Sequence, residues 1–176
     1  MDETGHSFRA RVAPTWAPVG HPPLLRRRDK RREVSSIVAL VAPHGRVPAH
    51  LYARHQEGSF DTQDVIHALR YFRRKVGRPL TVVWDGLNQH RSAQMRDFIA
   101  SHPEDFHLEQ LPGYAPDLNP EEGCNSVVKA ELRNATPHSV SELRAQARTS
   151  FMRLGHRHRT LAAFFRGAGL SLNGLP

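Results

Sequence analysis

The sequence predicts a mixed α/β fold in which helices pack against a sheet. Short apolar segments of strand length, such as residues 80–84, alternate with longer segments in which apolar residues recur at helical spacing, as in residues 62–76. An Asp, Asn or Ser stands just before each of the clear helical segments, where its side chain can cap the helix. With 176 residues the chain has the size of one domain, so we expect a single domain over residues 1–176, with residues 135–176 as a C-terminal helical extension.

The first third of the chain combines loops with a hairpin. Residues 4–23 are rich in Gly, Pro and other turn residues, which predicts an ordered loop or hairpin directly after Asp2. Residues 26–32 then place six cations in seven positions, which suits either a solvated loop or contact with phosphate groups. Apolar residues at 34–41 and 47–52 flank a Pro-His-Gly break, and this pattern predicts two paired strands.

The middle of the chain alternates helices and strands. Asp61 can cap the clearest amphipathic helix, and its apolar residues continue at helical spacing until a Gly and a Pro end it. The apolar strand at residues 80–84 leads into Asp85, whose side chain we expect at the strand's end in a cleft. A short helix that begins near Ser92 and a strand over residues 106–111 follow.

Residues 111–122, with the sequence LPGYAPDLNPEE, bring an acidic pair onto the first turn of a helix. Asn119 can cap this helix, and Pro120 suits its first position, where a missing N–H costs nothing. Glu122 then occupies the third position, where it either points into a site or completes a capping box with Asn119. We expect a further helix from Ser139 and a helical tail after it.

The chain is strongly basic, with a formal net charge of +8 and a pI near 10.7, and only three of its 25 basic residues are lysines. Guanidinium groups suit phosphate oxygens. The charge therefore indicates a nucleic acid or an anionic membrane surface as partner, unless the genome favours arginine throughout. Four arginines are candidate phosphate contacts or ordinary solvated helix residues: Arg73, Arg74, Arg91 and Arg96.

Several classes of protein are excluded. The single cysteine, Cys124, rules out an intrachain disulfide and a multi-cysteine zinc module. Neither a GxxxxGK[ST] loop nor a GxGxxG motif is present, which removes the usual nucleotide-binding folds. No apolar run approaches the roughly 20 residues that span a bilayer, and the N-terminus lacks a signal-peptide core, so we expect a cytoplasmic protein without membrane contact.

Three acidic residues come from separate segments and are candidate metal ligands: Asp2, Asp85 and Glu122. Carboxylates from different elements are the ligands that hard divalent cations prefer. In a basic protein they suggest metal-dependent chemistry on a polyanion. Asp85 is followed by Gly, a pair that also forms ordinary turns, and residues as close to a terminus as Asp2 are often disordered.

Three blocks resemble the catalytic domain of DDE-type transposases, specifically the bacterial insertion-sequence branch of the mariner superfamily. Residues 1–5 (MDETG) together with 15–20 (TWAPVG) are similar to the first-aspartate block. Residues 83–92 (VWDGLNQHRS) resemble the second block, and residues 111–123 (LPGYAPDLNPEEG), continuing to Lys129, resemble the third. The third block is highly specific, and the resemblance implies a ribonuclease-H-like fold.

The resemblance implies that Asp2, Asp85 and Glu122 are the catalytic acids and hold two Mg²⁺ or Mn²⁺ ions. Glu121 is adjacent and leaves the choice of third ligand open, although the family tolerates many residues there. His90 lies at a recurring family position and would be auxiliary. The implied activity is cleavage of double-stranded DNA at transposon ends and strand transfer into target DNA, carried out by a homodimer on DNA.

The chain departs from the family pattern in three respects. The apolar residues that precede the first aspartate are absent, so we expect a truncated first strand. We also expect the family's N-terminal DNA-binding domain to be absent, and Asn125 replaces a tryptophan. We therefore expect this chain alone to bind DNA mainly through charge and to be poorly active or inactive. The alternative is a non-catalytic DNA-binding or subunit-binding remnant that modulates an intact transposase; an unrelated ribonuclease-H-like nuclease is disfavoured by the third block.

Overall fold

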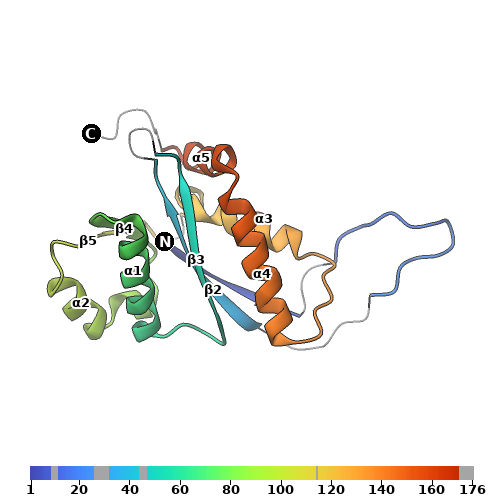
Figure 1. Cartoon of the computed structure of the whole chain (residues 1–176), viewed down its shortest axis with the longest axis horizontal. Helices are drawn as coiled ribbons and strands as arrows, with labels where there is room; N and C mark the ends of the chain where they lie inside the picture. Colours follow the sequence, from blue (N-terminus) through green and yellow to red (C-terminus); the bar gives the residue numbers. More distant parts are fainter. Residues whose placement is uncertain (9–11, 26–31, 44–46, 114, 171–176) are drawn as a thin grey trace.

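The computed structural model describes residues 1–176 except 9–11, 26–31, 44–46, 114 and 171–176 (Figure 1). Strands come first and helices predominate toward the C-terminus. In chain order the elements are β1 (Asp2–Ser7), β2 (Arg32–Val41), β3 (His50–Glu57), α1 (Thr62–Val76), β4 (Leu80–Trp84), η1 (Asn88–Arg91), α2 (Ala93–Ala100), β5 (Phe106–Gln110), η2 (Pro116–Leu118), α3 (Glu121–Glu131), α4 (Val140–Gly155) and α5 (His158–Gly167).

The strands form an antiparallel and a parallel group that meet at β1. β1, β2 and β3 are antiparallel in this order, and β4 pairs with β5 in parallel. The amino group of Met1 donates a hydrogen bond of 2.6 Å to the carbonyl oxygen of Val83, which places the start of β1 beside the end of β4. The carboxyl end of β4, where Asp85 follows, therefore lies next to Asp2.

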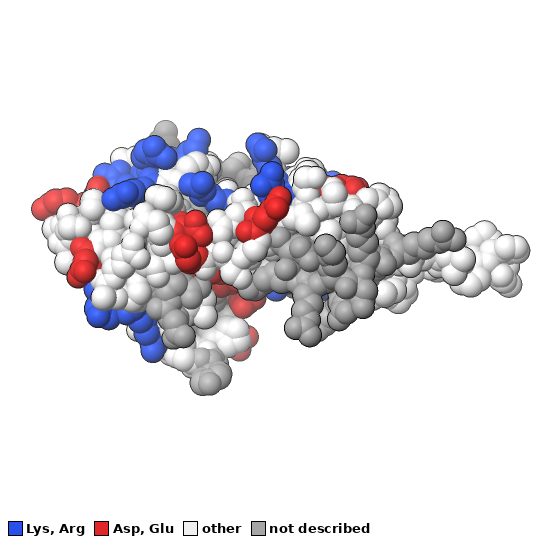
Figure 2. All heavy atoms as spheres, turned by 90° about the horizontal axis from the view of Figure 1, so that it is seen from below, with Lys and Arg blue, Asp and Glu red and all other residues white. Residues whose placement is uncertain are grey.

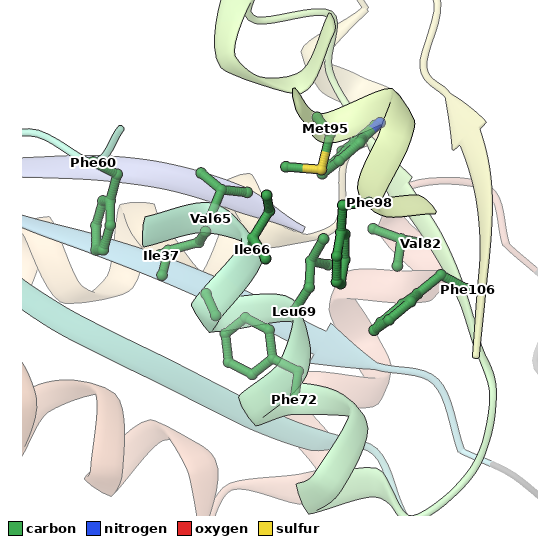
Figure 3. Packing of buried hydrophobic residues seen from close by; sticks show 12 residues of the cluster. Ile37, Phe60, Val65, Ile66, Leu69, Phe72, Val82, Met95, Phe98 and Phe106 are labelled. Atoms are coloured by element: carbon green, nitrogen blue, oxygen red, sulfur yellow. The ribbon is translucent and has the colours of Figure 1, made fainter. Parts of the chain in front are cut away.

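Two hydrophobic clusters cover opposite faces of the antiparallel strands. Successive residues of a strand point to opposite faces, so Ile37 enters one cluster and Val38 the other. The first cluster packs β2 against α1, α2, β4 and β5, with Phe72 and Met95 fully buried (Figure 3). The second packs the sheet against α3, α4 and α5 around Phe151. The sheet is thus a middle layer between two helical layers, as Figure 1 shows.

Three of the expected helix starts are confirmed in detail. Asp61 and Asp64 form a reciprocal capping box at α1, and Gly77 ends that helix in the left-handed region at φ 73°. Ser92 caps α2 by accepting from the N–H of Met95, and Ser139 caps α4 in the same way. None of the helices within the described ranges is both long and apolar enough to cross a membrane.

Two local expectations are wrong. Residues 4–7 belong to β1 rather than to an ordered loop or a hairpin within residues 4–23, because pairing with β2, in which Thr4 lies opposite Ser36, outweighs the local turn signals. Helix α3 begins at Glu121, one residue later than expected, and Asn119 accepts a hydrogen bond of 3.1 Å from the N–H of Glu121. The cationic run expected at residues 26–32 lies, except for its last residue, outside the described residues.

Candidate active site

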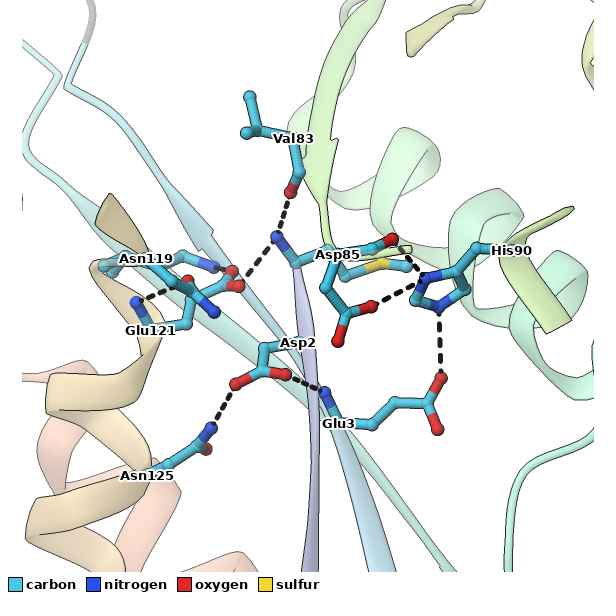
Figure 4. A network of polar contacts seen from close by, with 10 residues as sticks. Asp2, Glu3, Val83, Asp85, His90, Asn119, Glu121 and Asn125 are labelled. Atoms are coloured by element: carbon cyan, nitrogen blue, oxygen red, sulfur yellow. Dashed lines mark hydrogen bonds and ion pairs between the residues drawn. The ribbon is translucent and has the colours of Figure 1, made fainter. Parts of the chain in front are cut away.

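Asp2 is the first residue of β1 and is largely buried, with 9% of its surface exposed. Its Oδ1 accepts a hydrogen bond of 2.7 Å from the N–H of Glu3, and its Oδ2 accepts one of 2.7 Å from Asn125 Nδ2 (Figure 4). Burial raises the pKa of Asp2 to about 6, and the negative charges of Glu121 and Glu122 add to this. Asp2 therefore lies within electrostatic reach of the expected third acid.

The two adjacent glutamates of α3 point in different directions. Glu121 is 2% exposed; it forms an ion pair of 2.7 Å with the amino group of Met1 and accepts a hydrogen bond of 2.6 Å from the N–H of Leu40. Burial raises the pKa of Glu121. Glu122 is exposed and lines a cavity. Glu121 thus ties α3 to the strands, whereas Glu122 is accessible to a ligand.

Asp85 follows β4 and is held by His90. His90 Nδ1 lies 3.0 Å from Asp85 Oδ1, and the ring stacks on Trp84 at a centroid distance of 4.2 Å. His90 Nε2 lies 3.3 Å from Glu3 Oε1, so the buried ring connects Asp85 to β1 (Figure 4). The Asp85 side chain remains 44% exposed. His90 Nδ1 also lies 3.0 Å from the carbonyl oxygen of Asp85, and the N–H of Leu87 donates a hydrogen bond of 3.3 Å to Asp85 Oδ1. His90 and Leu87 together fix the direction of a carboxylate that solvent can still reach.

Asn125 and Glu3 are site residues whose contacts the sequence did not predict. The sequence indicated only a loss of packing at Asn125, but its side chain is 2% exposed and donates to Asp2. A signal was present: Asn125 lies between the apolar residues Cys124 and Val128 on α3, and a polar side chain buried there requires a partner. The position of Glu3 directly after Asp2 gives no comparable signal.

A cavity of about 460 Å³ adjoins Glu122. One wall comes from β1, at Gly5, His6 and Ser7, and another from a single face of α3. The α3 face is acidic at its start, at Glu122, and basic toward its end, at Lys129, and Arg133 follows shortly after the helix. Cations next to a carboxylate suit a phosphate-bearing chain whose reacting bond lies at the acidic end.

The three expected acids lie on neighbouring elements, but they are not gathered into a ready ligand group. Within the described parts of the chain, no three His, Cys, Asp or Glu side chains are arranged to hold a metal ion. The donors themselves fit Mg²⁺ or Mn²⁺, since all are carboxylate oxygens. Each oxygen of Asp2 already accepts one hydrogen bond and retains a lone pair for a cation. Their role as metal ligands stays a prediction.

Comparison with solved structures finds this architecture in Mos1 transposase. The Mos1 paired-end complex with the left transposon end matches with a TM-score of 0.53 and 14% identity, over 93% of this chain and 54% of that chain. The Mos1 mariner paired-end complex with Mn matches with a TM-score of 0.50 and 14% identity, over 93% of this chain and 54% of that chain. The Mos1 strand transfer complex matches with a TM-score of 0.50 and 15% identity, over 92% of this chain and 52% of that chain. The chain thus spans about half the length of the Mos1 chains, and the likeness confirms the ribonuclease-H-like fold.

Among curated proteins, none matches this sequence significantly. The model of one protein family, described as DDE superfamily endonuclease, matches residues 1–144, which is most of the chain. On this match, the chain belongs to the DDE superfamily of endonucleases.

Proposed function

We propose that this chain is the catalytic core of a DNA transposase that cleaves DNA strands and joins them to target DNA, and that it belongs to the bacterial insertion-sequence branch of the mariner superfamily. One observation carries the proposal. In a chain of the DDE superfamily, Asp2 and Asp85 stand at the touching ends of β1 and β4, and Glu122 faces a cavity lined by Lys129 and Arg133.

In this proposal Asp2, Asp85 and Glu122 hold two Mg²⁺ or Mn²⁺ ions. Such an ion pair, when bound, activates the attacking water or 3′ hydroxyl and stabilises the leaving oxygen of the phosphodiester. His90 keeps the Asp85 carboxylate directed toward the site. Lys129 and Arg133 bind the phosphates of the strand that lies along α3.

The proposed partners are double-stranded DNA, as transposon ends and as target, and a second copy of the chain. Several solved structures of similar architecture are complexes of Mos1 transposase; one is a paired-end complex with the left transposon end and another is a strand transfer complex. Two DNA ends that react together require two active sites, which favours a homodimer on DNA. We place this activity in the bacterial cytoplasm, where the DNA lies.

The test is Mg²⁺-dependent nicking of a supercoiled plasmid by the wild type and by Asp85→Asn and Glu122→Gln. Both variants should lose nicking and keep DNA binding, because each loses one metal ligand without a change in volume. Glu104→Gln is the matched control, since Glu104 is exposed at the opposite end of the parallel strands. Equal nicking by all four proteins would end the assignment of the site.

A second function is favoured by the hydrogen bond between Asn125 and Asp2. That bond and the burial of Asp2 leave one acid less open to a cation than its partners. A chain with such a site would act as a non-catalytic subunit that binds DNA or an intact transposase and lowers its activity. No nicking by the wild type, combined with inhibition of a full-length transposase in a mixture, would identify this function.

A further inference from the structure

A second hollow, with a volume of about 550 Å³, is lined mainly by basic residues and lies away from the acids described above. Its lining comes from β3, from α1 and from the segment that joins α2 to β5. We call it the arginine hollow; its residues are Arg54, His67, Arg70, Arg73, Arg74, His102, Asp105 and Phe106.

The arginine hollow lies at the opposite edge of the parallel strands from Asp85. β4 and β5 run in the same direction, with Leu80 paired to Phe106 at the amino ends of the strands. Phe106 lines the hollow, whereas Asp85 follows the carboxyl end of β4. Five residues of strand at about 3.3 Å each separate the two edges by roughly 16 Å. One phosphate cannot occupy both sites.

The positive charge of the hollow is largely uncompensated within the described residues. Only Arg73 has an acidic partner there, Asp105, at 2.7 Å. Arg70 lies over the ring of Phe98 at 5.1 Å, a contact that leaves the edge of its guanidinium group open to solvent. Arg70, Arg74 and Arg54 are all exposed.

Only some of the basic residues in the arginine hollow are explained by their position in the last turn of α1. Cations in the last turn of a helix are stabilised by its dipole, which applies to Arg73, Arg74 and Lys75. Arg54 comes from β3, however, so a second element brings a cation to the same hollow. Among the described residues on the face that Figure 2 shows, the Lys and Arg side chains, with Asp and Glu between them, lie over the left half, where Figure 1 places α1, α2 and the parallel strands.

We propose that the arginine hollow binds the phosphate backbone of a DNA duplex at a segment other than the one in the active site. The proposal rests on DNA being the substrate, as argued above, and adds a second contact surface. Several exposed guanidinium groups around an open hollow suit a repeating polyanion, since each group binds phosphate oxygens without reading a base. The molecule then holds DNA on both edges of its parallel strands.

The test is a salt titration of binding to a 30-base-pair duplex, followed by fluorescence anisotropy without divalent metal. Arg70→Gln/Arg74→Gln should flatten the plot of log K against log salt concentration by about two, because each lost phosphate contact removes about 0.9 from the slope. Arg144→Gln/Arg148→Gln is the matched control: it removes two exposed arginines, also four residues apart, from α4, and should leave the slope unchanged. Arg70→Lys/Arg74→Lys should retain most of the wild-type slope, because it keeps both positive charges.

Two outcomes would overturn the proposal. One is an unchanged slope in Arg70→Gln/Arg74→Gln; the other is an equal loss in the α4 control, which would reflect net charge alone. The measurement needs no catalysis, so it is independent of the nicking assay. If the slope flattens but the chain does not nick DNA, the proposed activity is refuted and DNA binding by the arginine hollow stands. If the chain nicks DNA but the slope is unchanged, the proposed activity stands and DNA binding by the arginine hollow is refuted.

Discussion

The buried carboxyl group of Asp2 should make the stability of the folded chain fall as the pH rises. Burial beside Glu121 and Glu122 raises its pKa from 3.8 to about 6, so the folded state holds the proton more tightly than the unfolded state does. The stability that this proton provides is complete below pH 4 and is lost as the pH passes 6. At about 1.4 kcal/mol for each pH unit between the two pKa values, the loss reaches about 3 kcal/mol.

The Asp2→Asn variant should not show this loss, because its amide is neutral throughout. Its side-chain oxygen can still accept from the N–H of Glu3 or from Asn125. Above pH 6 the variant should therefore be more stable than the wild type by up to about 3 kcal/mol, and near pH 4 the two should converge. The measurement is urea unfolding from pH 4 to pH 8.

The difference between the two proteins is the quantity to compare, because His55 titrates in the same range. Burial, together with Arg148 and Arg144, lowers the pKa of His55 to about 4, and this applies to both proteins. At pH 7, Mg²⁺ should stabilise the wild type more than Asp2→Asn, since the cation binds only the ionised carboxylate. A constant difference from pH 4 to pH 8 would refute the reasoning about burial, and equal stabilisation by Mg²⁺ would remove Asp2 from the metal site.

Three further predictions concern packing and reactivity. Gly123→Ala should lower the melting temperature, because the ring of Phe164 occupies the space that a Cβ would need; Gly167→Ala, where that space is open, is the control. Phe72→Ala should lower the free energy of unfolding by about 3–5 kcal/mol in urea titrations, since Phe72 is 1% exposed in the core around α1. Burial raises the pKa of the Cys124 thiol to about 12, so Ellman's reagent should react with it only after denaturation, and fast labelling of the native protein would contradict this.

The helices could be predicted from the sequence because their signals are local. The caps at Asp61, Ser92 and Ser139 and the apolar spacing after them lie within a few residues of one another. The continuation of the first strand through residues 4–7 could not be predicted, because Thr4 and Gly5 favour a turn and the strand forms only by pairing with β2, about thirty residues away.

The candidate site divides in the same way. The sequence blocks predict Asp85 and Glu122 as site residues, and the structure places Asp85 directly after β4 and Glu122 in the first turn of α3. The contacts of Asn125 with Asp2 and of His90 with Glu3 join residues more than eighty positions apart. Only the folded sheet brings them together. The local pattern of α3 indicates that Asn125 needs a partner, but it does not indicate that the partner is Asp2.

The alternation of side chains along β1 links the two halves of the molecule. Asp2 turns toward α3 and Glu3 toward His90, so one short strand serves the helical layers on both sides (Figure 4). Sliding β1 by a single residue would exchange these two carboxylates, giving each layer the wrong partner. The pairing of Asp2 with Val38 therefore sets both features at once: when β1 and β2 pair in the correct register, Asp2 and Glu3 also face their correct partners.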